Sequence, residues 1–128
     1  MNQQNEKTKI LLVEDDPFLI DIYSTKLRSN GFEIDVAHDG EEALRKITER
    51  APDLVLLDIV LPRVDGWEVL NRIKKQSQFK DLKIIILSNL GQEQEVRKGL
   101  ELGVAGYLIK SHYSPSEIIA EIKKVLQK

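Results

Sequence analysis

The chain has 128 residues with a formal net charge of −2; 41% of its residues are hydrophobic and 31% are charged, as in a single soluble globular domain with an adequate core. Because the chain contains no cysteine, disulfides, thiolate metal sites and a cysteine nucleophile are excluded. The charge gives no support for direct nucleic-acid binding and no apolar run approaches membrane-spanning length, so we expect a cytoplasmic protein that contacts neither nucleic acid nor membrane.

The first predicted strand is an apolar run, Ile10 to Val13, preceded by a polar segment, residues 1–8, that we expect to be a disordered lead-in. A run without polar alternation is typical of a strand buried on both faces of a parallel sheet. Three acids follow it directly: Glu14, Asp15 and Asp16. The last of them is well placed as the N-cap of a helix that has Pro17 in its first turn and Asn30-Gly31 at its end.

The second predicted strand, residues 32–37, alternates apolar and polar side chains. This pattern indicates one wetter face and a position at the edge of the sheet. Asp39 and Glu42 have the spacing of a capping box and predict the start of a second helix. After Pro52, another fully apolar strand runs from Leu54 and ends in the carboxylate of Asp58.

The second half of the chain continues the alternation of helix and strand. We predict a helix from Asp65 or Gly66 to Lys75, a strand over Ile84–Leu87 that ends in Ser88, a charged helix from Gln92 to Leu102, and a strand over Val104–Ile109 that ends in Lys110. The charged helix is expected to turn Val96 and Leu100 toward the core, and Gly103 to end it. Ser114, Pro115 and Glu117 then form a strong start for the last helix.

Five strands therefore alternate with five helices over residues 9–128, with short turns between them. This alternation predicts an α/β fold: a doubly wound five-stranded parallel sheet with right-handed crossovers and helices on both faces. We find no internal repeat and no linker, so residues 9–128 are expected to form one domain. Periodicity leaves the order of the strands open, although the half-exposed second strand is the best candidate for an edge.

Four of the strands end in groups that carry chemistry, namely Glu14-Asp15-Asp16, Asp58, Ser88 and Lys110. In parallel sheets these groups meet at the carboxyl edge, where ligands bind in such folds. Converging carboxylates repel one another unless a cation intervenes, either the Lys110 ammonium or a hard divalent metal such as Mg²⁺. A carboxylate beside Mg²⁺, a hydroxyl and a lysine suits phosphoryl transfer onto Asp58 itself.

This arrangement resembles the receiver domain of two-component response regulators over the span from about Lys9 to Leu126. The matching elements are Ile10–Asp16, Leu57-Asp58 with Leu61-Pro62 and Asp65-Gly66, Leu87-Ser88, and Tyr107–Lys110. The resemblance implies a flavodoxin-like fold, like that of the chemotaxis regulators, with strand order 2-1-3-4-5. It also implies a phosphoprotein that acts as a response regulator in phosphorelay signal transduction.

The resemblance implies that Asp58 is the phospho-acceptor and part of a Mg²⁺ site. Asp15 is implied as a direct metal ligand, Glu14 as a ligand through a metal-bound water, and Val60 as a ligand through its backbone carbonyl. The expected phosphoryl donor is a sensor histidine kinase or a phosphotransfer protein. The chain would be no enzyme beyond catalysing its own phosphorylation and slow dephosphorylation.

Ser88 and Tyr107 are implied as the switch pair, in which the hydroxyl moves toward the phosphoryl group and the aromatic ring swings inward. Lys110, together with Ser88, is implied to bind the phosphoryl group. The switch would act on a surface of the fourth helix, fifth strand and fifth helix that binds a downstream protein or a second copy of the chain. The family usually has proline after the lysine, commonly in a cis peptide; Ser111 stands there, so this loop is either strained or differently shaped.

Two other classes of protein use a similar sheet. A binding module of the same fold that is not phosphorylated is disfavoured by the acid pair with Asp58 and Lys110, whereas Asn89 and Ser111 leave it open. A hydrolase with an aspartate nucleophile would need a second aspartate where Val60 stands, which excludes that class. Because Val60 and Leu90 are apolar and orient no attacking water, we predict slow hydrolysis of the phosphorylated form.

Overall fold

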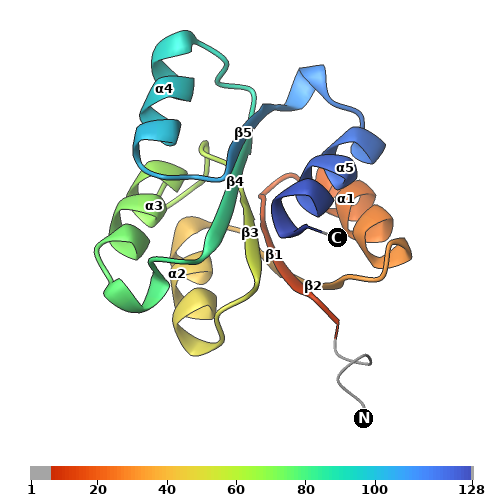
Figure 1. Ribbon diagram of the computed structural model, residues 1–128, viewed down its shortest axis with the longest axis horizontal. Coiled ribbons are helices and arrows are strands. Elements are labelled where there is room, and N and C mark those ends of the chain that lie inside the picture. The colour runs from red at the N-terminus through yellow and green to blue at the C-terminus, as the bar shows by residue number, and fades with distance from the viewer. Residues whose placement is uncertain (1–6, 128) are drawn as a thin grey trace.

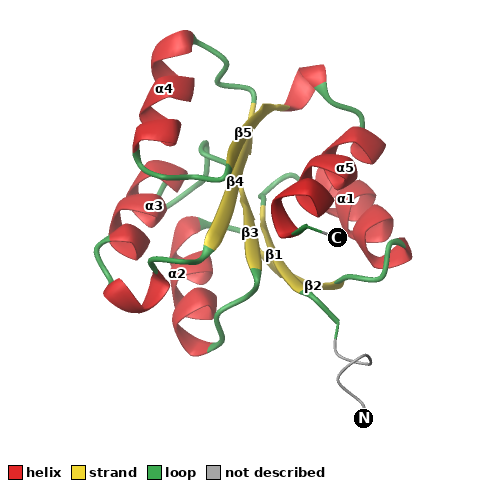
Figure 2. Cartoon of the chain, viewed as in Figure 1, coloured by secondary structure: helices red, strands yellow, loops and turns green. Residues whose placement is uncertain are grey.

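Five parallel strands form the centre of the molecule, and five helices cover the sheet (Figures 1 and 2). The computed structural model describes residues 7–127. The strands are β1 (Lys9–Val13), β2 (Glu33–Ala37), β3 (Leu54–Leu57), β4 (Lys83–Ser88) and β5 (Gly106–Ile109). The helices are α1 (Pro17–Ser29), α2 (Gly40–Glu49), α3 (Gly66–Lys74), α4 (Glu93–Glu101) and α5 (Pro115–Leu126), with short 3-10 turns at Ser77–Phe79 and Lys110–His112. Most of the lead-in expected over residues 1–8 lies outside the described residues.

The sheet has the order β2-β1-β3-β4-β5, and each neighbouring pair of strands is parallel. This result confirms the α/β class, the strand order and the edge position of the second strand. The alternating pattern of β2 has a simple cause: only β1 pairs with it, so part of the strand is exposed to solvent. The central strands β1 and β3 are buried along nearly their whole length, in accord with their apolar runs.

The helices form two layers, with α1 and α5 on one face of the sheet and α2, α3 and α4 on the other (Figure 1). Successive residues of β1 point into different cores: Ile10 and Leu12 lie under α1 and α5, whereas Leu11 and Val13 lie under the other layer. A strand with a core on each side must be apolar at every position. None of the helices in residues 7–127 is long and apolar enough to cross a membrane.

The helix starts follow the predicted capping chemistry with one exception. Asp16 accepts the Phe18 N–H of α1 at 2.9 Å, and Ser114 and Glu117 form a complete capping box on α5. Asp39 caps α2 by accepting the Glu42 N–H at 2.8 Å. The predicted capping box is wrong there, because the Glu42 carboxylate accepts the backbone N–H of His38 at 2.7 Å instead of that of Asp39.

The fourth helix differs from the prediction in the side chain that it buries. Leu100 was expected to face the core, but 52% of its surface is exposed, whereas its neighbour Gly99 is buried. Val96 is half-buried. The last strand also begins later than predicted, at Gly106 instead of Val104. The inner side of α4 is thus shifted by one residue, and a glycine takes the place of a leucine.

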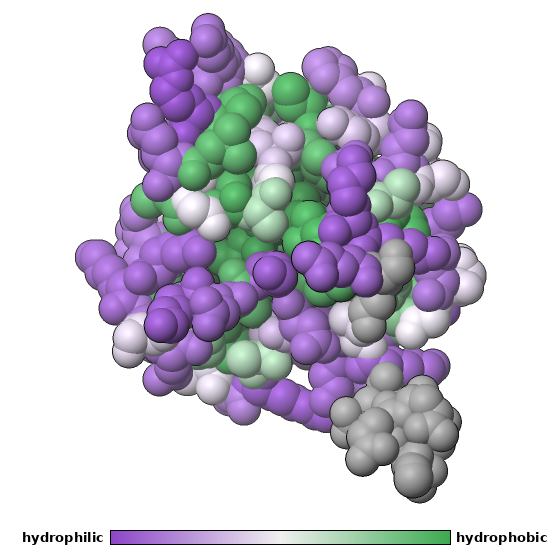
Figure 3. Space-filling view, viewed as in Figure 1, coloured by the Kyte–Doolittle hydropathy of each residue, from purple (hydrophilic) through white to green (hydrophobic). Residues whose placement is uncertain are grey.

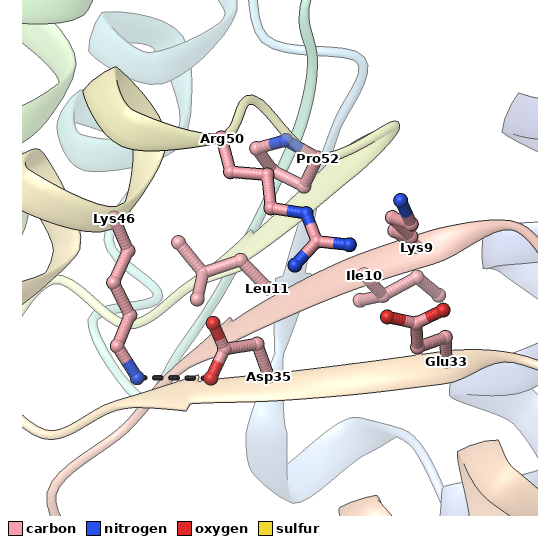
Figure 4. Close-up of a pocket in the computed structure, with 8 residues that line it drawn as sticks. All are labelled: Lys9, Ile10, Leu11, Glu33, Asp35, Lys46, Arg50 and Pro52. Carbon is pink, nitrogen blue, oxygen red and sulfur yellow. Dashed lines mark hydrogen bonds and ion pairs between the residues drawn. The ribbon is translucent and has the colours of Figure 1, made fainter.

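Lys46 of α2 covers part of the exposed edge of β2, beside Asp35 and Val36. A small cavity of about 50 Å³ lies there, lined by Lys46 and Asp35 among other residues. Figure 4 shows Lys46 directed at Asp35. The Lys46 ammonium lies 2.9 Å from the Asp35 carboxylate and 2.6 Å from the carbonyl oxygen of Val36. A charged side chain bonded to an outward carbonyl blunts an edge strand against pairing with another chain.

Candidate functional site

Two acids are held rigidly at the carboxyl edge of the sheet by backbone hydrogen bonds. The Glu14 N–H donates to the Ala37 carbonyl at 3.0 Å, and the Asp58 N–H donates to the Val13 carbonyl at 3.1 Å. These bonds extend the ladders one residue beyond β1 and β3. The two carboxylates are therefore fixed by the sheet itself, while the residues that follow each of them belong to loops.

Glu14, Asp15 and Asp58 form one carboxylate cluster. One oxygen from each of the three lies within 4.8 Å of the others. Glu14 is 1% exposed and Asp58 6%, whereas Asp15 is exposed to solvent. Burial raises the pKa of Glu14 above its ordinary value, and the negative charge of Asp58 raises it further, although Lys110 offsets part of the effect. The cluster is thus a site of concentrated negative charge with one open side.

Lys110 reaches this cluster from the end of β5. Its ammonium lies 2.8 Å from a Glu14 oxygen and 2.9 Å from an Asp58 oxygen. Burial by itself lowers the pKa of Lys110, but the hydrogen bonds to both carboxylates outweigh it, so the pKa is raised and the lysine stays charged. One ammonium contacts two of the three carboxylates of the cluster, which leaves negative charge that a further cation can neutralise.

The donor set fits a hard divalent metal. Carboxylate and carbonyl oxygens are the ligands that Mg²⁺ prefers, usually one or two carboxylates together with water. The structure brings the exposed carboxylate of Asp15 together with the buried carboxylates of Asp58 and Glu14. Val60 lies in the loop after β3, where its N–H donates to Asp58 at 3.3 Å and its side chain is 62% exposed.

Ser88 and Tyr107 are joined through the backbone of Leu90, a link that was not predicted from the sequence. The Ser88 hydroxyl oxygen accepts the backbone N–H of Leu90 at 3.3 Å, and the Tyr107 hydroxyl donates to the carbonyl oxygen of the same Leu90. Ser88 is completely buried at the end of β4, and Tyr107 is half-buried against the core. Only backbone atoms of Leu90 take part, so its side-chain type gave no signal in the sequence.

The loop between Asp58 and α3 is fastened to α2 by contacts that were also missed. Arg63, which has a positive φ of 66°, places its guanidinium 3.1 Å from the carboxylate of Asp39. Gly40 lies so close to the backbone of Val64 that a methyl group added at this glycine would overlap the Val64 carbonyl. The loop that begins at Asp58 is therefore held against the start of α2 by Arg63 and Val64, several residues away from Asp58.

The loop after Lys110 is differently shaped, which was one of the two forms expected without the usual proline. Residues Lys110–His112 form a 3-10 turn, and no peptide bond within residues 7–127 is cis. This turn leads to the Ser114 cap of α5 and leaves the Lys110 side chain directed into the carboxylate cluster.

A model of the response regulator receiver domain matches residues 10–123, that is, nearly the whole described chain. The chain belongs to this family. Receiver domains are the modules of two-component regulatory systems whose standard function is to be phosphorylated by a kinase. The cluster of Glu14, Asp15 and Asp58 provides acidic pocket residues of the kind that this function requires.

Curated relatives and solved structures agree with this family. The chain is 38% identical over 125 residues to the probable transcriptional regulator ycf27 of Pyropia yezoensis, covering 98% of this chain and 50% of the relative. It is 36% identical over 120 residues to the alkaline phosphatase synthesis transcriptional regulatory protein PhoP of Bacillus subtilis, covering 94% and 49%. The chain therefore spans about half the length of these relatives. A crystal structure of a CheX–CheY–BeF3–Mg+2 complex from Borrelia burgdorferi has a chain that is 30% identical, with a TM-score of 0.88 and coverage of 100% and 96%.

Proposed function

We propose that the chain accepts a phosphoryl group on Asp58 from a phosphohistidine of a partner protein and so changes the surface that it offers to a second partner. In the transfer, an oxygen of the Asp58 carboxylate forms a bond to phosphorus. The bond between phosphorus and the imidazole nitrogen of the donor breaks, and the imidazole leaves. The product is an acyl phosphate at the edge of the sheet.

The observation that carries the proposal is the ion pair between Lys110 and Asp58, 2.9 Å long, within the carboxylate cluster. An ammonium in this position neutralises charge on the nucleophile and then on the phosphoryl oxygens. Ser88, at the end of the neighbouring strand, supplies a hydroxyl that donates to one of those oxygens once its contact with Leu90 is released. Each of these residues lies on or next to a strand end and is therefore positioned before any ligand arrives.

A divalent cation completes this set. We infer that Asp15, Asp58 and the carbonyl oxygen of Val60 bind Mg²⁺ directly and that Glu14 binds it through water. The bound ion supplies further neutralisation of the transferring group. The similar chain from Borrelia burgdorferi was solved in a complex with BeF3 and Mg+2, which supports the proposal that this chain binds a phosphoryl group together with Mg²⁺. The enzymatic role is limited to the chain's own phosphorylation and slow dephosphorylation.

The changed surface is proposed to be that of α4, β5 and α5. Figure 3 shows hydrophobic side chains gathered on this side of the molecule, over β5 and between α4 and α5. Tyr107 belongs to β5, and its hydroxyl is bonded to the loop that leads into α4. A shift of Ser88 toward a phosphoryl group would therefore reach this surface through Leu90 and Tyr107. The partners proposed for the protein are a sensor kinase or phosphotransfer protein and a downstream protein, or a second copy of the chain.

Beryllofluoride, which mimics an aspartyl phosphate, tests the proposal. With Mg²⁺ present, a ¹⁹F NMR titration should give a resonance of bound beryllofluoride that Asp58→Asn abolishes. Asp65→Asn is the matched control, because Asp65 caps α3 and asparagine keeps that cap. Absence of a bound resonance in the unmodified chain would favour the alternative of a binding module that is not phosphorylated. The cytoplasmic location stays a prediction.

A further inference from the structure

Gly99 is the one residue of α4 that is fully buried, and it lies directly against the ring of Tyr107. A methyl group added at Gly99 would come 2.9 Å from Cδ2 of Tyr107 and 3.0 Å from Cδ1 of Ile86. Both distances are shorter than ordinary carbon–carbon contact. The inward position of the Tyr107 ring therefore depends on the absence of a side chain at residue 99.

The two neighbours differ in their freedom to move away. Ile86 lies opposite Tyr107 in the ladder between β4 and β5 and is 0% exposed, so it is confined by the core. Tyr107 is half-buried, and rotation about its χ1 carries the ring toward solvent. An added methyl group would thus displace the tyrosine more easily than the isoleucine.

The helix itself is held in place from its other side. The ammonium of Lys98 lies 4.3 Å from the ring centroid of Trp67 on α3, a cation–π contact that ties α4 to its neighbour. The carbonyl of Gly99 also accepts the N–H groups of Leu102 and Val104, at 3.1 and 3.4 Å. A shift of α4 away from Tyr107 would disturb the contact of Lys98 with Trp67 and the bond of Gly99 to Val104, whereas an outward swing of the ring leaves both in place.

Glycine is a poor choice for a helix on grounds of propensity, because alanine stabilises a helix interior relative to it. We propose that Gly99 sets the position of Tyr107: the missing side chain provides the clearance that lets the ring stay inward with its hydroxyl on the Leu90 carbonyl. Residue 99 is thus a positioning residue for the aromatic ring, and substitution by alanine drives the ring outward.

The first test compares Gly99→Ala with the unmodified chain by NMR, without phosphoryl donor, beryllofluoride or metal. The expected result is loss of the nuclear Overhauser contacts between the Tyr107 ring and the Ile86 methyl groups, while Trp67, the only tryptophan, keeps its emission spectrum. Gly106→Ala is the matched control. A methyl group there meets only ordinary contacts, 3.9 and 4.0 Å from Ile85, although it is next to Tyr107 in sequence. Retained contacts between Tyr107 and Ile86 in Gly99→Ala would overturn the proposal.

A thermodynamic cycle covers the case in which Gly99→Ala folds poorly. Gly99→Ala should lower the urea midpoint of the unmodified chain and should lower it less, or raise it, in a Tyr107→Ala background where the ring is gone. An equal loss in both backgrounds would overturn the proposal, because the collision would then lie with Ile86 or the backbone.

The consequence for signalling rests on the proposed function and is measured separately. If the inward ring accompanies the phosphorylated form, a fall of the inward population to about one tenth raises the half-saturating beryllofluoride concentration about tenfold. Unchanged affinity together with an outward ring would contradict the link to phosphorylation but not the role of Gly99. Absence of beryllofluoride binding in the unmodified chain would contradict the proposed function alone.

Discussion

Lys110 and Asp58, which are 52 residues apart in the chain, form an ion pair with an N–O distance of 2.9 Å at the carboxyl edge of the sheet. The same ammonium binds Glu14 at 2.8 Å, so one cation holds two buried carboxylates in place. In the interior, the removal of one partner is costly because it leaves the other charge unpaired. The pair therefore matters for folding as well as for chemistry.

Replacement of Lys110 by methionine should destabilise the fold by about 2 to 4 kcal/mol, because methionine fills the space but leaves Glu14 and Asp58 without their cation. Urea unfolding at neutral pH measures the effect. Mg²⁺ should recover more stability in this variant than in the unmodified chain, since a bound cation replaces part of the lost charge. Lys83→Met, which changes an exposed lysine at the start of β4, is the control and should have little effect. An unchanged midpoint for Lys110→Met would refute this account of the pair.

Ser88→Ala should separate metal binding from response to the phosphoryl group. The hydroxyl lies at the end of β4 and takes no part in the proposed metal site, so the affinity for Mg²⁺ should stay the same. Beryllofluoride affinity should fall about tenfold or more, because one hydrogen bond to a charged group is lost. Isothermal titration of both ligands provides the two numbers. A parallel loss of Mg²⁺ affinity would mean that Ser88 acts on the structure of the site instead.

Glu42 should make stability depend on pH under acidic conditions. The hydrogen bond from the backbone N–H of His38 is the largest cause of the low Glu42 pKa, which falls from its ordinary 4.5 to about 2. Burial opposes this shift, whereas the side chains of His38 and Lys46 add to it. A lowered pKa in the folded state means that the stabilisation is complete above about pH 4.5 and is lost as the pH falls toward 2. Because the side chain is 25% exposed, solvent screening limits the effect to about 1 to 2 kcal/mol.

Denaturation of Glu42→Gln and the unmodified chain between pH 2 and pH 6 measures this contribution. The difference in unfolding free energy between the two proteins should shrink as the pH falls through that window. Two curves that stay parallel throughout would show that the pKa of Glu42 is not lowered in the folded protein.

Much of the fold could be predicted from the pattern of apolar and polar side chains along each strand. Short continuous apolar runs such as Leu54–Leu57, which follows Pro52, favour strands with a core on each side, and the alternation at Ile34 and Val36 marks an edge. The strand order came from the family resemblance, since periodicity contains no information on which strands pair. The convergence of Asp58 and Lys110 then follows, because the carboxyl ends of parallel strands share one edge.

The features that sequence reasoning missed depend on backbone atoms or on small shifts. The link from Ser88 to Tyr107 uses only the peptide groups of Leu90, so no side-chain pattern reports it. Leu100 was expected inside because its spacing from Val96 is helical, but Leu100 is exposed and Gly99 faces the core instead. At position 99 the Tyr107 ring leaves no room for a side chain. Before α2, the Glu42 carboxylate accepts the N–H of His38 and not that of Asp39, which the capping-box spacing had predicted.

The phosphorylated form should persist for minutes or longer at neutral pH. Val60 is 62% exposed beside Asp58 and Leu90 is half-buried beside Ser88, and neither side chain offers a hydrogen bond to an attacking water. Val60→Glu should shorten the lifetime several-fold, whereas Val60→Ile, which stays apolar, should leave it unchanged. Loss of ³²P label from the phosphorylated protein gives the rate; decay within seconds would refute the prediction.

The central claim is that Asp58 itself carries the phosphoryl group. After incubation with acetyl phosphate and Mg²⁺, reduction with borohydride converts an aspartyl phosphate into homoserine, and peptide mass spectrometry then locates the altered residue. We predict homoserine at residue 58, with Asp15 and Asp65 unchanged, and no conversion in Asp58→Asn. Conversion at another acid, or none while the protein binds Mg²⁺ normally, would contradict the claim.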